Sequence, residues 1–398
     1  MKPILVRADR CFDGAATSSN VTLQIENGRI AQVHKEAPPQ GEVIEFPGCT
    51  LLPGLIDTHV HLVFCAADTH QAVIAQVEGE SDDELLARAE RNARAALRTG
   101  ITTLRDCGGR NRVVQTLRDR INKGYVEGPE VLACGMPITT LLGHCHWLGL
   151  RAETNDEVVR AAERMLKEDA DFLKVMATGG NMTRTSDPLV AQYDADAITL
   201  IADIGRQAHR HTAAHVLSRA GLPATVAARV RTIEHCDWRV EVNRYEFDAE
   251  LAARIRNQDQ YVGLTMSGTA RRAFHPEVAK FNPQVAARLD ARFECERRMI
   301  ETGIRYTIHS DAGVGLTPID RFAEGLHTAL IELKLSPAEV LAAATRTAAL
   351  AIGFDDRGQL APGKRADLLV VAGDPFVDFA ALEQVRAVMK AGQWIDLD

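Results

Sequence analysis

Residues 54–62 read GLIDTHVHL, a short apolar run that ends in two histidines two positions apart, His59 and His61. Seven further apolar runs follow, separated by stretches with helical spacing: ITTLRDCG, EVLACGM, DFLKVMAT, TAAHVL, TIEHCD, YVGLTMSG and RYTIHSDAG. Short apolar runs that alternate with helices indicate βα units and a parallel sheet. Eight such runs predict an α/β fold, a closed (β/α)8 TIM barrel.

Helix signals lie between the runs. Ser81 precedes an acidic first turn, and Gly100 follows the last helix-period residue, which predicts a helix between them. Thr154 and Asn155 begin a similar stretch, EVVRAAERMLKEDA. These caps favour helices, and not further strands, as the connections of the barrel.

Both ends of the chain lack helical spacing. Residues 1–52 read as short strands with a turn signal at Asn27-Gly28, and strand signals return after Gly353. The simplest arrangement pairs the two ends. We therefore expect a small β-sandwich domain from residues 1–53 plus 358–398, interrupted by the barrel at 54–357.

The composition is that of a soluble globular protein, because apolar residues make up 46% and charged residues 25% of the 398 positions. A net charge of -8, with no long run of Lys and Arg, argues against a nucleic-acid partner. No window is apolar for the length of a membrane helix, and no membrane partner is expected. The eight cysteines form no CxxC pair, which favours a reducing cytoplasm.

Polar residues that can bind metals recur where the predicted strands end. Barrels build their active sites at this edge. Residues two apart in a strand face the same side, so His59 and His61 can enter the barrel mouth together. The other candidates lie in or after the fourth, fifth, sixth and eighth runs: Lys174, His215, His235 and Asp311. Such imidazole and carboxylate ligands suit zinc and similar divalent ions.

A single buried histidine is more often a hydrogen-bonded core residue than a metal ligand. Four histidines and an acid at one edge would be a costly coincidence, because buried polar groups need partners. The joint pattern therefore favours a metal site.

Lys174 stands in the apolar run FLKVMA. A lysine is ordinarily exposed or salt-bridged, and a bare ammonium beside metal ions would be repelled. If CO2 adds to the amine, the side chain becomes an anionic carbamate that can bridge two cations. This modification would make Lys174 a ligand.

Taken together, LLPGLIDTHVHL, KVMATGG, AAH, IEH, HSDAG and GQLAPGKRADLLVV resemble the signature of the amidohydrolase superfamily, in its prolidase-like and imidazolonepropionase-like branch. The resemblance covers almost the whole chain. It implies two divalent ions, with zinc expected, bridged by N6-carboxylated Lys174. It further implies that one ion is held by His59, His61 and Asp311, and the other by His215 and His235.

Two substrate contacts are implied by the same resemblance. His144 is similar to the family histidine that polarises the substrate carbonyl, and Tyr193 to a substrate-binding tyrosine after the fourth strand. His275, on the seventh loop, has no assigned role.

Asp311 is the expected catalytic group, which accepts a proton from the attacking water and passes it to the leaving nitrogen. The favoured reaction is hydrolysis of an amide C–N bond in a small molecule: an N-acyl amino acid, a dipeptide or a cyclic amide. Ser218 stands where related deaminases usually carry a catalytic Glu, which disfavours deamination. Val216-Leu217 interrupts the HxHG segment common in the prolidase-like arm, which puts peptide specificity in doubt.

Two other readings remain open. The same site suits hydrolysis of a carbamate, a urea or a related synthetic compound. A non-catalytic relative is disfavoured by the intact ligand set. The sequence does not choose between a monomer and a homo-oligomer.

Overall fold

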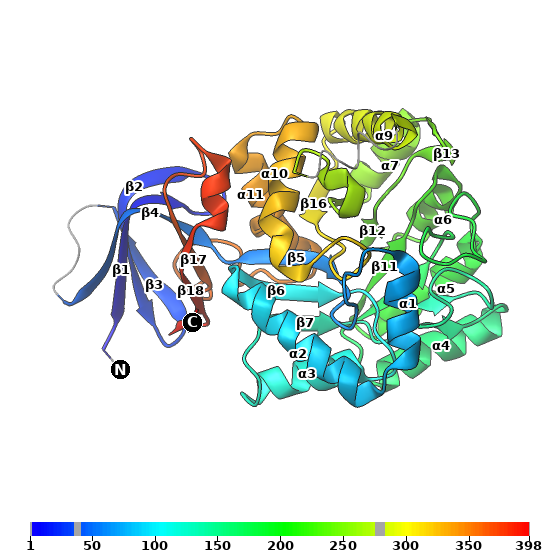
Figure 1. Cartoon of the computed structure of the whole chain (residues 1–398), viewed down its shortest axis with the longest axis horizontal. Helices are drawn as coiled ribbons and strands as arrows, with labels where there is room; N and C mark the ends of the chain where they lie inside the picture. Colours follow the sequence, from blue (N-terminus) through cyan, green and yellow to red (C-terminus); the bar gives the residue numbers. More distant parts are fainter. Residues whose placement is uncertain (1, 36–40, 275–282, 398) are drawn as a thin grey trace.

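A computed structural model describes residues 2–35, 41–274 and 283–397, so His275 lies outside the described residues. The two ends of the chain form one seven-stranded mixed sheet in the order β19-β18-β17-β4-β1-β2-β3. Its strands are β1 (Ile4–Phe12), β2 (Thr17–Glu26), β3 (Arg29–His34), β4 (Val43–Pro53), β17 (Leu368–Ala372), β18 (Val385–Lys390) and β19 (Gln393–Trp394). Figure 1 shows these blue and red strands together at one side of the molecule.

The pairing of β4 with β17 joins the two ends, with Pro53 opposite Leu368 and Cys49 opposite Ala372. Buried residues from both ends, including Val6, Leu51 and Leu368, share one apolar cluster. The predicted turn at Asn27-Gly28 connects β2 to β3, where both residues have positive φ, 49° and 76°. The two ends of the chain thus pair with each other in this sheet.

The eight apolar runs form strands, and each of these strands is parallel to the neighbours with which it pairs. One sheet contains β5 (Leu55–Val60), β6 (Ile101–Asp106) and β7 (Glu130–Ala133). A second has the order β16-β15-β12-β11-β10-β8-β9. It comprises β8 (Ile138–Thr139), β9 (Leu150–Arg151), β10 (Phe172–Met176), β11 (His211–His215), β12 (Thr232–Glu234), β15 (Tyr261–Thr265) and β16 (Arg305–His309).

Hydrogen bonds connect the two parallel sheets at both edges. On one side the amide of His61 donates to the carbonyl of Ala312 at 2.8 Å, and the amide of Asp311 to that of His59 at 2.9 Å. On the other, the amide of Asp171 donates to the carbonyl of Ala133 at 2.9 Å. These bonds bring the ends of β5 and β16 together.

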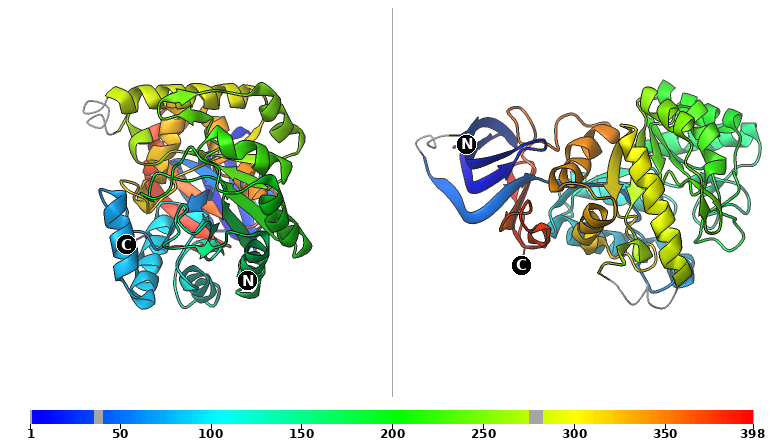
Figure 2. Two further views of the ribbon diagram at one scale, coloured as in Figure 1. Left: turned by 90° about the vertical axis from the view of Figure 1, so that its right-hand side faces the viewer. Right: turned by 90° about the horizontal axis from the view of Figure 1, so that it is seen from above.

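Helices lie between most of these strands and around them (Figure 2). They are α1 (His70–Gly79), α2 (Asp82–Arg98), α3 (Val113–Asn122), α4 (Asn155–Lys167), α5 (Ala195–Gln207), α6 (Leu222–Ala227), α7 (Ala249–Asn257), α9 (Pro283–Glu301), α10 (Phe322–Glu332), α11 (Pro337–Ala343) and α12 (Arg346–Ala351). Ser81 caps α2 and Thr154 caps α4, each in a capping box with a Glu three residues later. Both predicted helix starts are confirmed.

Gly54 alone separates β4 of the terminal sheet from β5 of the parallel strands. A Cβ atom at this position would lie 2.3 Å from the hydroxyl oxygen of Thr102 in β6, so the close approach of the chain to β6 requires glycine. The short connection ties the terminal sheet to the strand that carries His59.

All eight cysteines are free. Within the described residues, no helix combines the length and the apolar character needed to cross a membrane.

Candidate metal centre

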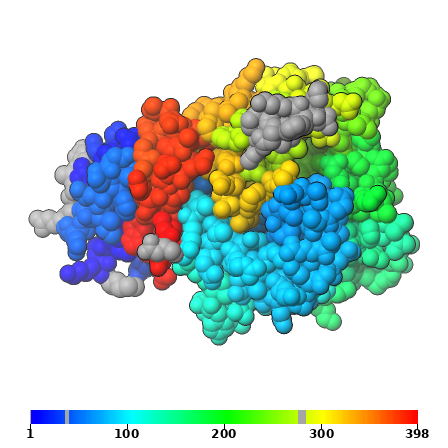
Figure 3. All heavy atoms as spheres, viewed as in Figure 1, coloured from blue at the N-terminus to red at the C-terminus, as the bar shows by residue number. Residues whose placement is uncertain are grey.

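A cavity of about 520 Å³ opens at the carboxyl ends of the parallel strands. The segment that leads into α1 and the segment around Leu316 meet at this face, where the amide of Leu316 donates to the carbonyl of Ala67 at 3.0 Å (Figure 3). The cavity is lined by every residue predicted to bind metal and by His144: His59, His61, His144, Lys174, His215, His235 and Asp311. The structure therefore brings these residues together from five strands and the loop after β8.

His59, His61 and Asp311 form the first group of candidate ligands. Oδ1 of Asp311 lies 3.5 Å from Nε2 of His59 and 3.3 Å from Nε2 of His61. The opposite nitrogens are anchored, because Nδ1 of His59 donates to Glu234 and Nδ1 of His61 donates to the carbonyl of Gly108, each at 3.0 Å. This anchoring leaves both Nε2 atoms directed toward the same carboxylate.

His215 and His235 form the second group. Nδ1 of His235 hydrogen-bonds the hydroxyl of Thr265 at 2.7 Å, and Nε2 of His215 donates to the carbonyl of Gly179 at 3.2 Å. The remaining nitrogens, Nδ1 of His215 and Nε2 of His235, face each other at 3.0 Å. The two groups adjoin, since the ring centroids of His59 and His235 are 5.2 Å apart.

Backbone conformation helps to direct these side chains inward. His235 and Asp311 both have positive φ, 66° and 55°. Residues other than glycine adopt this conformation rarely, and it is concentrated at functional sites. Each residue closely follows a strand, so the turn reverses the chain at the cavity.

Burial leaves most of the rings neutral. It lowers the pKa of His59, His215 and His235 well below 6.5, and the charge of Lys174 acts in the same direction on all three. The pKa of His61 is instead raised, because its hydrogen bond to Asp311 and the charge of that carboxylate outweigh burial. Neutral imidazoles present the lone pairs that a divalent ion needs.

Lys174 is 2% exposed, and its amine has no hydrogen-bond partner among the described residues. An ammonium buried beside four histidines without an acceptor carries a large desolvation penalty. The unpartnered amine fits a site in which this side chain is modified or contacts ions.

Glu234 holds one member of the first group, His59, in place by a hydrogen bond. Its Oε2 accepts the bond from His59, and its Oε1 accepts from Nη2 of Arg105 at 2.6 Å. Burial opposes ionisation, but the charge of Arg105 and other contacts lower the pKa of Glu234 to about 2. The carboxylate therefore stays charged and holds the imidazole of His59, as carboxylates commonly do for metal-binding histidines.

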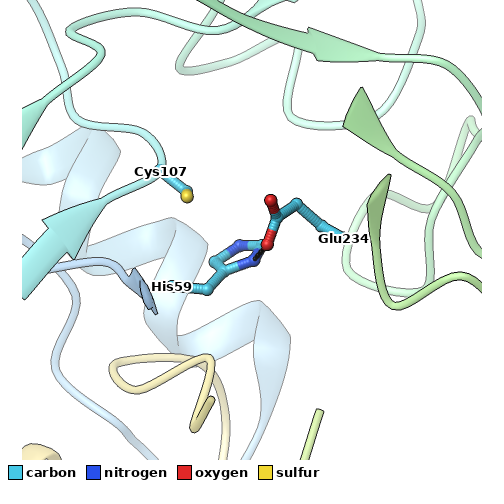
Figure 4. A group of neighbouring side chains, drawn as sticks. All are labelled: His59, Cys107 and Glu234. Carbon is cyan, nitrogen blue, oxygen red and sulfur yellow. Dashed lines mark hydrogen bonds and ion pairs between the residues drawn. The ribbon is translucent and has the colours of Figure 1, made fainter. Parts of the chain in front are cut away.

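Cys107 lies near the same pair, and ligand atoms of His59, Cys107 and Glu234 fall within 4.8 Å of one another (Figure 4). This second triad does not fit a cation. Burial raises the pKa of the Cys107 thiol to about 12, and the guanidinium of Arg105 already neutralises Glu234. The better candidate for a metal-binding group is therefore His59, His61 and Asp311.

Glu234→Gln is expected to weaken metal binding by about 10- to 100-fold, the usual cost of removing a group that orients a ligand. Metal titration of the stripped protein measures the effect. The conservative change keeps the shape of the side chain, and circular dichroism checks the fold. Unchanged affinity would show that Glu234 does not hold His59 for metal binding.

His144 contacts the second group, because its ring stacks on that of His215 with the ring centroids 4.4 Å apart. Burial lowers the pKa of His144 to about 3, so the ring is neutral at ordinary pH. Its Nδ1 has no partner among the described residues. A Cβ on Gly180 would lie 2.3 Å from this Nδ1, so glycine leaves the space in which the ring stands.

Tyr193 is not brought to the cavity. It is absent from the lining residues, and its hydroxyl donates to the carbonyl of Ala152 at 2.7 Å. Its position therefore gives no support to a role in substrate binding, which stays a prediction.

Four residues at or beside the site were not predicted from the sequence: Glu234, Arg105, Thr265 and His70. Glu234 directly precedes a predicted ligand in TIEHCD, which was the one available signal. His70 lines the cavity, and its Nδ1 accepts from the amide of Gly315 at 3.4 Å. No local pattern marks Arg105 or Thr265.

Comparisons with known proteins identify the family of this chain. The model of the amidohydrolase family matches residues 50–395. Ochratoxinase from Aspergillus niger is 25% identical over 401 residues, which cover 93% of this chain and 81% of that protein. Imidazolonepropionase from Salinispora arenicola (strain CNS-205) is 24% identical over 392 residues, covering 88% of this chain and 86% of that protein.

A crystal structure of a Xaa-Pro dipeptidase with bound methionine has a TM-score of 0.87 at 24% identity and covers 99% of this chain and 100% of that chain. At this identity the match shows a shared fold. Proteins of the superfamily generally use metal ions, and the described residues include candidate ligand groups. The chain belongs to the amidohydrolase family, and it is a hydrolase that acts on C–N bonds.

Proposed function

We propose that this enzyme hydrolyses an amide C–N bond in an N-acyl amino acid, a dipeptide or a cyclic amide, with two divalent ions held in the cavity. His59, His61 and Asp311 would hold one ion, and His215 and His235 the other. The observation that carries the proposal is the unpartnered amine of Lys174, whose charge acts on histidines of both groups.

Carboxylation would resolve the misfit of this amine. CO2 adds to the neutral Nζ, an N–C bond forms, one proton leaves, and the product is a carbamate with one negative charge. Its two oxygens can bridge two cations, which a bare ammonium would repel. Zinc is the metal that these imidazole and carboxylate ligands favour.

When bound, such ions lower the pKa of water and polarise a carbonyl group. Asp311 would accept a proton from the attacking water at a carboxylate oxygen and deliver it to the leaving nitrogen. His144 would donate a hydrogen bond from its ring to the substrate carbonyl oxygen. Its neutral ring, which lines the cavity, suits this task.

Replacing His144 with Ala should lower turnover by roughly 10²- to 10³-fold, the cost of losing one oxyanion donor. Metal content should not change. Gly180→Ala should act in the same direction, because its Cβ needs the space of the His144 ring. Nearby His146 bonds the carbonyl of Gly143 and does not line the cavity, so His146→Ala is the matched control. Metal loss in His144→Ala would contradict the assignment.

A second candidate reaction is hydrolysis of a carbamate or a urea, because the same groups can attack these carbonyls. Attack then expels the alcohol or amine and leaves a carbamic acid, which decomposes to an amine and CO2. Deamination is disfavoured, since Ser218 after β11 supplies no carboxylate for proton transfer. A non-catalytic relative would not need the convergent ligand set.

The decisive experiment reconstitutes metal-stripped protein with Zn²⁺ and bicarbonate, counts the bound ions, and screens N-acyl amino acids, dipeptides, cyclic amides, carbamates and ureas. We expect two ions per chain and turnover in the amide panel. His59→Ala, which removes a ligand nitrogen, serves as the inactive control. Turnover confined to carbamates or ureas would favour the second candidate, and less than one ion per chain would revive the non-catalytic reading.

The remaining architectural proposals rest on the same fold. We infer that the parallel strands close into a (β/α)8 barrel over residues 54–357, supported by hydrogen bonds at both edges of the two sheets. Residues 1–53 and 358–398 would form the small sandwich domain, supported by the β4–β17 pairing. The free cysteines favour a cytoplasmic location.

A further inference from the structure

Three arginines line one side of the cavity that holds the metal ligands: Arg239, Arg288 and Arg292. Arg239 begins the short strand β13 (Arg239–Glu241), which pairs with β14 (Arg244–Tyr245). Arg288 and Arg292 lie one turn apart on α9. Two segments distant in the sequence thus present positive charge to the same space.

The guanidinium of Arg292 is fixed by hydrogen bonds within the protein. Its Nε donates to Glu296 at 2.8 Å, and its Nη2 donates to the carbonyl of Thr265 at 2.5 Å. The hydroxyl of Thr265 in turn bonds His235. Arg292 therefore fixes the wall next to the second ligand group.

Arg239 is not held in this way. It is 5% exposed, and its Nε and Nη2 are buried without a hydrogen-bond partner among the described residues. A buried guanidinium that keeps unpartnered donors pays a desolvation cost that an anion in the cavity would offset. Arg239 also lines the cavity, so its incompletely partnered guanidinium points to a ligand site.

The acids nearby do not balance this charge. Asp237 lines the cavity and feels the charges of all three arginines, and Glu296 is tied to Arg292. Among the described residues, Asp237 is thus the one carboxylate lining the cavity that faces the two remaining guanidinium groups, those of Arg239 and Arg288. The phenol of Tyr245 also lines this wall and can donate a hydrogen bond.

We propose that Arg239, assisted by Arg288 and Tyr245, forms a carboxylate-binding subsite that selects substrates with an acidic group away from the scissile amide. The class that fits is an N-acyl amino acid or dipeptide with an Asp or Glu side chain. The planar fork of a guanidinium matches a carboxylate in two parallel hydrogen bonds. This inference rests on the proposed amide hydrolysis for the substrate class, but the anion site itself does not.

Binding is tested first without chemistry, in metal-stripped protein, with glutarate as the probe and calorimetry as the readout. Arg239→Gln should weaken glutarate binding by about 10- to 100-fold, the range for losing hydrogen bonds to a charged group. Arg239→Lys should restore part of the loss, because it keeps the charge without the fork. Arg219→Gln removes the same charge from a neighbouring residue that pairs with Glu246 at 2.9 Å and does not line the cavity, so it should bind like the parent.

Turnover is tested next with N-acetylglutamate and N-acetylglutamine, which match in size and differ in side-chain charge. The parent should prefer the acid through a lower KM, and Arg239→Gln should abolish the preference. Equal glutarate binding in the parent and Arg239→Gln, or binding of inorganic phosphate without glutarate, would overturn the subsite. Arg239-dependent glutarate binding without any hydrolysis would support the subsite while the proposed function fails. Hydrolysis without a charge preference would overturn the subsite and leave the function standing.

Discussion

Lys174→Ala is expected to lose at least one metal ion and nearly all activity, because the variant lacks the only group proposed to bridge the two ligand groups. The native amine is buried and without a partner among the described residues, so truncation breaks no hydrogen bond that the structure contains. The fold should survive the cavity that truncation leaves. Metal analysis and turnover, measured on the same preparation, check the prediction.

Added formate, acetate or propionate should restore part of the rate in Lys174→Ala. If the missing feature is a bridging carboxylate, a small free carboxylate can enter the vacated space and supply it. Reconstitution of the stripped parent should likewise depend on bicarbonate. Lys167→Ala, on the exposed end of α4, removes a lysine far from the cavity lining and should change neither metal content nor rescue.

Two results would contradict the bridging role of Lys174. One is full metal content with retained activity in Lys174→Ala. The other is an experimental structure with an unmodified amine directed away from a single ion. The site would then be mononuclear, held by His59, His61 and Asp311.

The succession of strands and helices along the chain could be predicted because its signals are local. Ser81 and Thr154 mark helix starts, and both helices begin where these caps stand. The convergence of His59 with Asp311 follows from topology alone, since parallel strands end at one edge. These features need no knowledge of side-chain packing.

The supporting contacts could not be predicted, because they depend on packing between distant segments. Glu234 meets His59 across 175 positions, and Arg105 reaches Glu234 across 129. The same limit explains Tyr193, whose hydroxyl bonds the backbone at Ala152, a contact that no motif encodes. Arg239 was missed because nothing in the sequence of its short hairpin shows that the residue lines the cavity.

The second large effect is expected in Asp311→Asn. The amide side chain has nearly the shape of the carboxylate and keeps one oxygen for a metal, but it cannot accept and return a proton at neutral pH. Turnover should therefore fall by several orders of magnitude while the fold and much of the metal content remain. His59→Ala provides the contrast, because it removes a ligand nitrogen and should lose metal together with activity.

The pH dependence of turnover distinguishes the role of Asp311 as a proton acceptor from its role as a metal ligand. Burial raises the pKa of Asp311, but the hydrogen bond and the charge of His61 outweigh it, so the carboxyl titrates below its ordinary value. A group with a lowered pKa is active as a base above that pKa, so the parent should keep its rate into weakly acidic solution and lose it only as the pH falls further. The residual rate of Asp311→Asn should lack that acid limb. Asp320→Asn, an exposed acid in the same strand-to-helix segment, should retain both the rate and the limb. Near-normal turnover by metal-loaded Asp311→Asn, on a substrate that the parent hydrolyses, would remove Asp311 as the proton acceptor and with it the proposed mechanism.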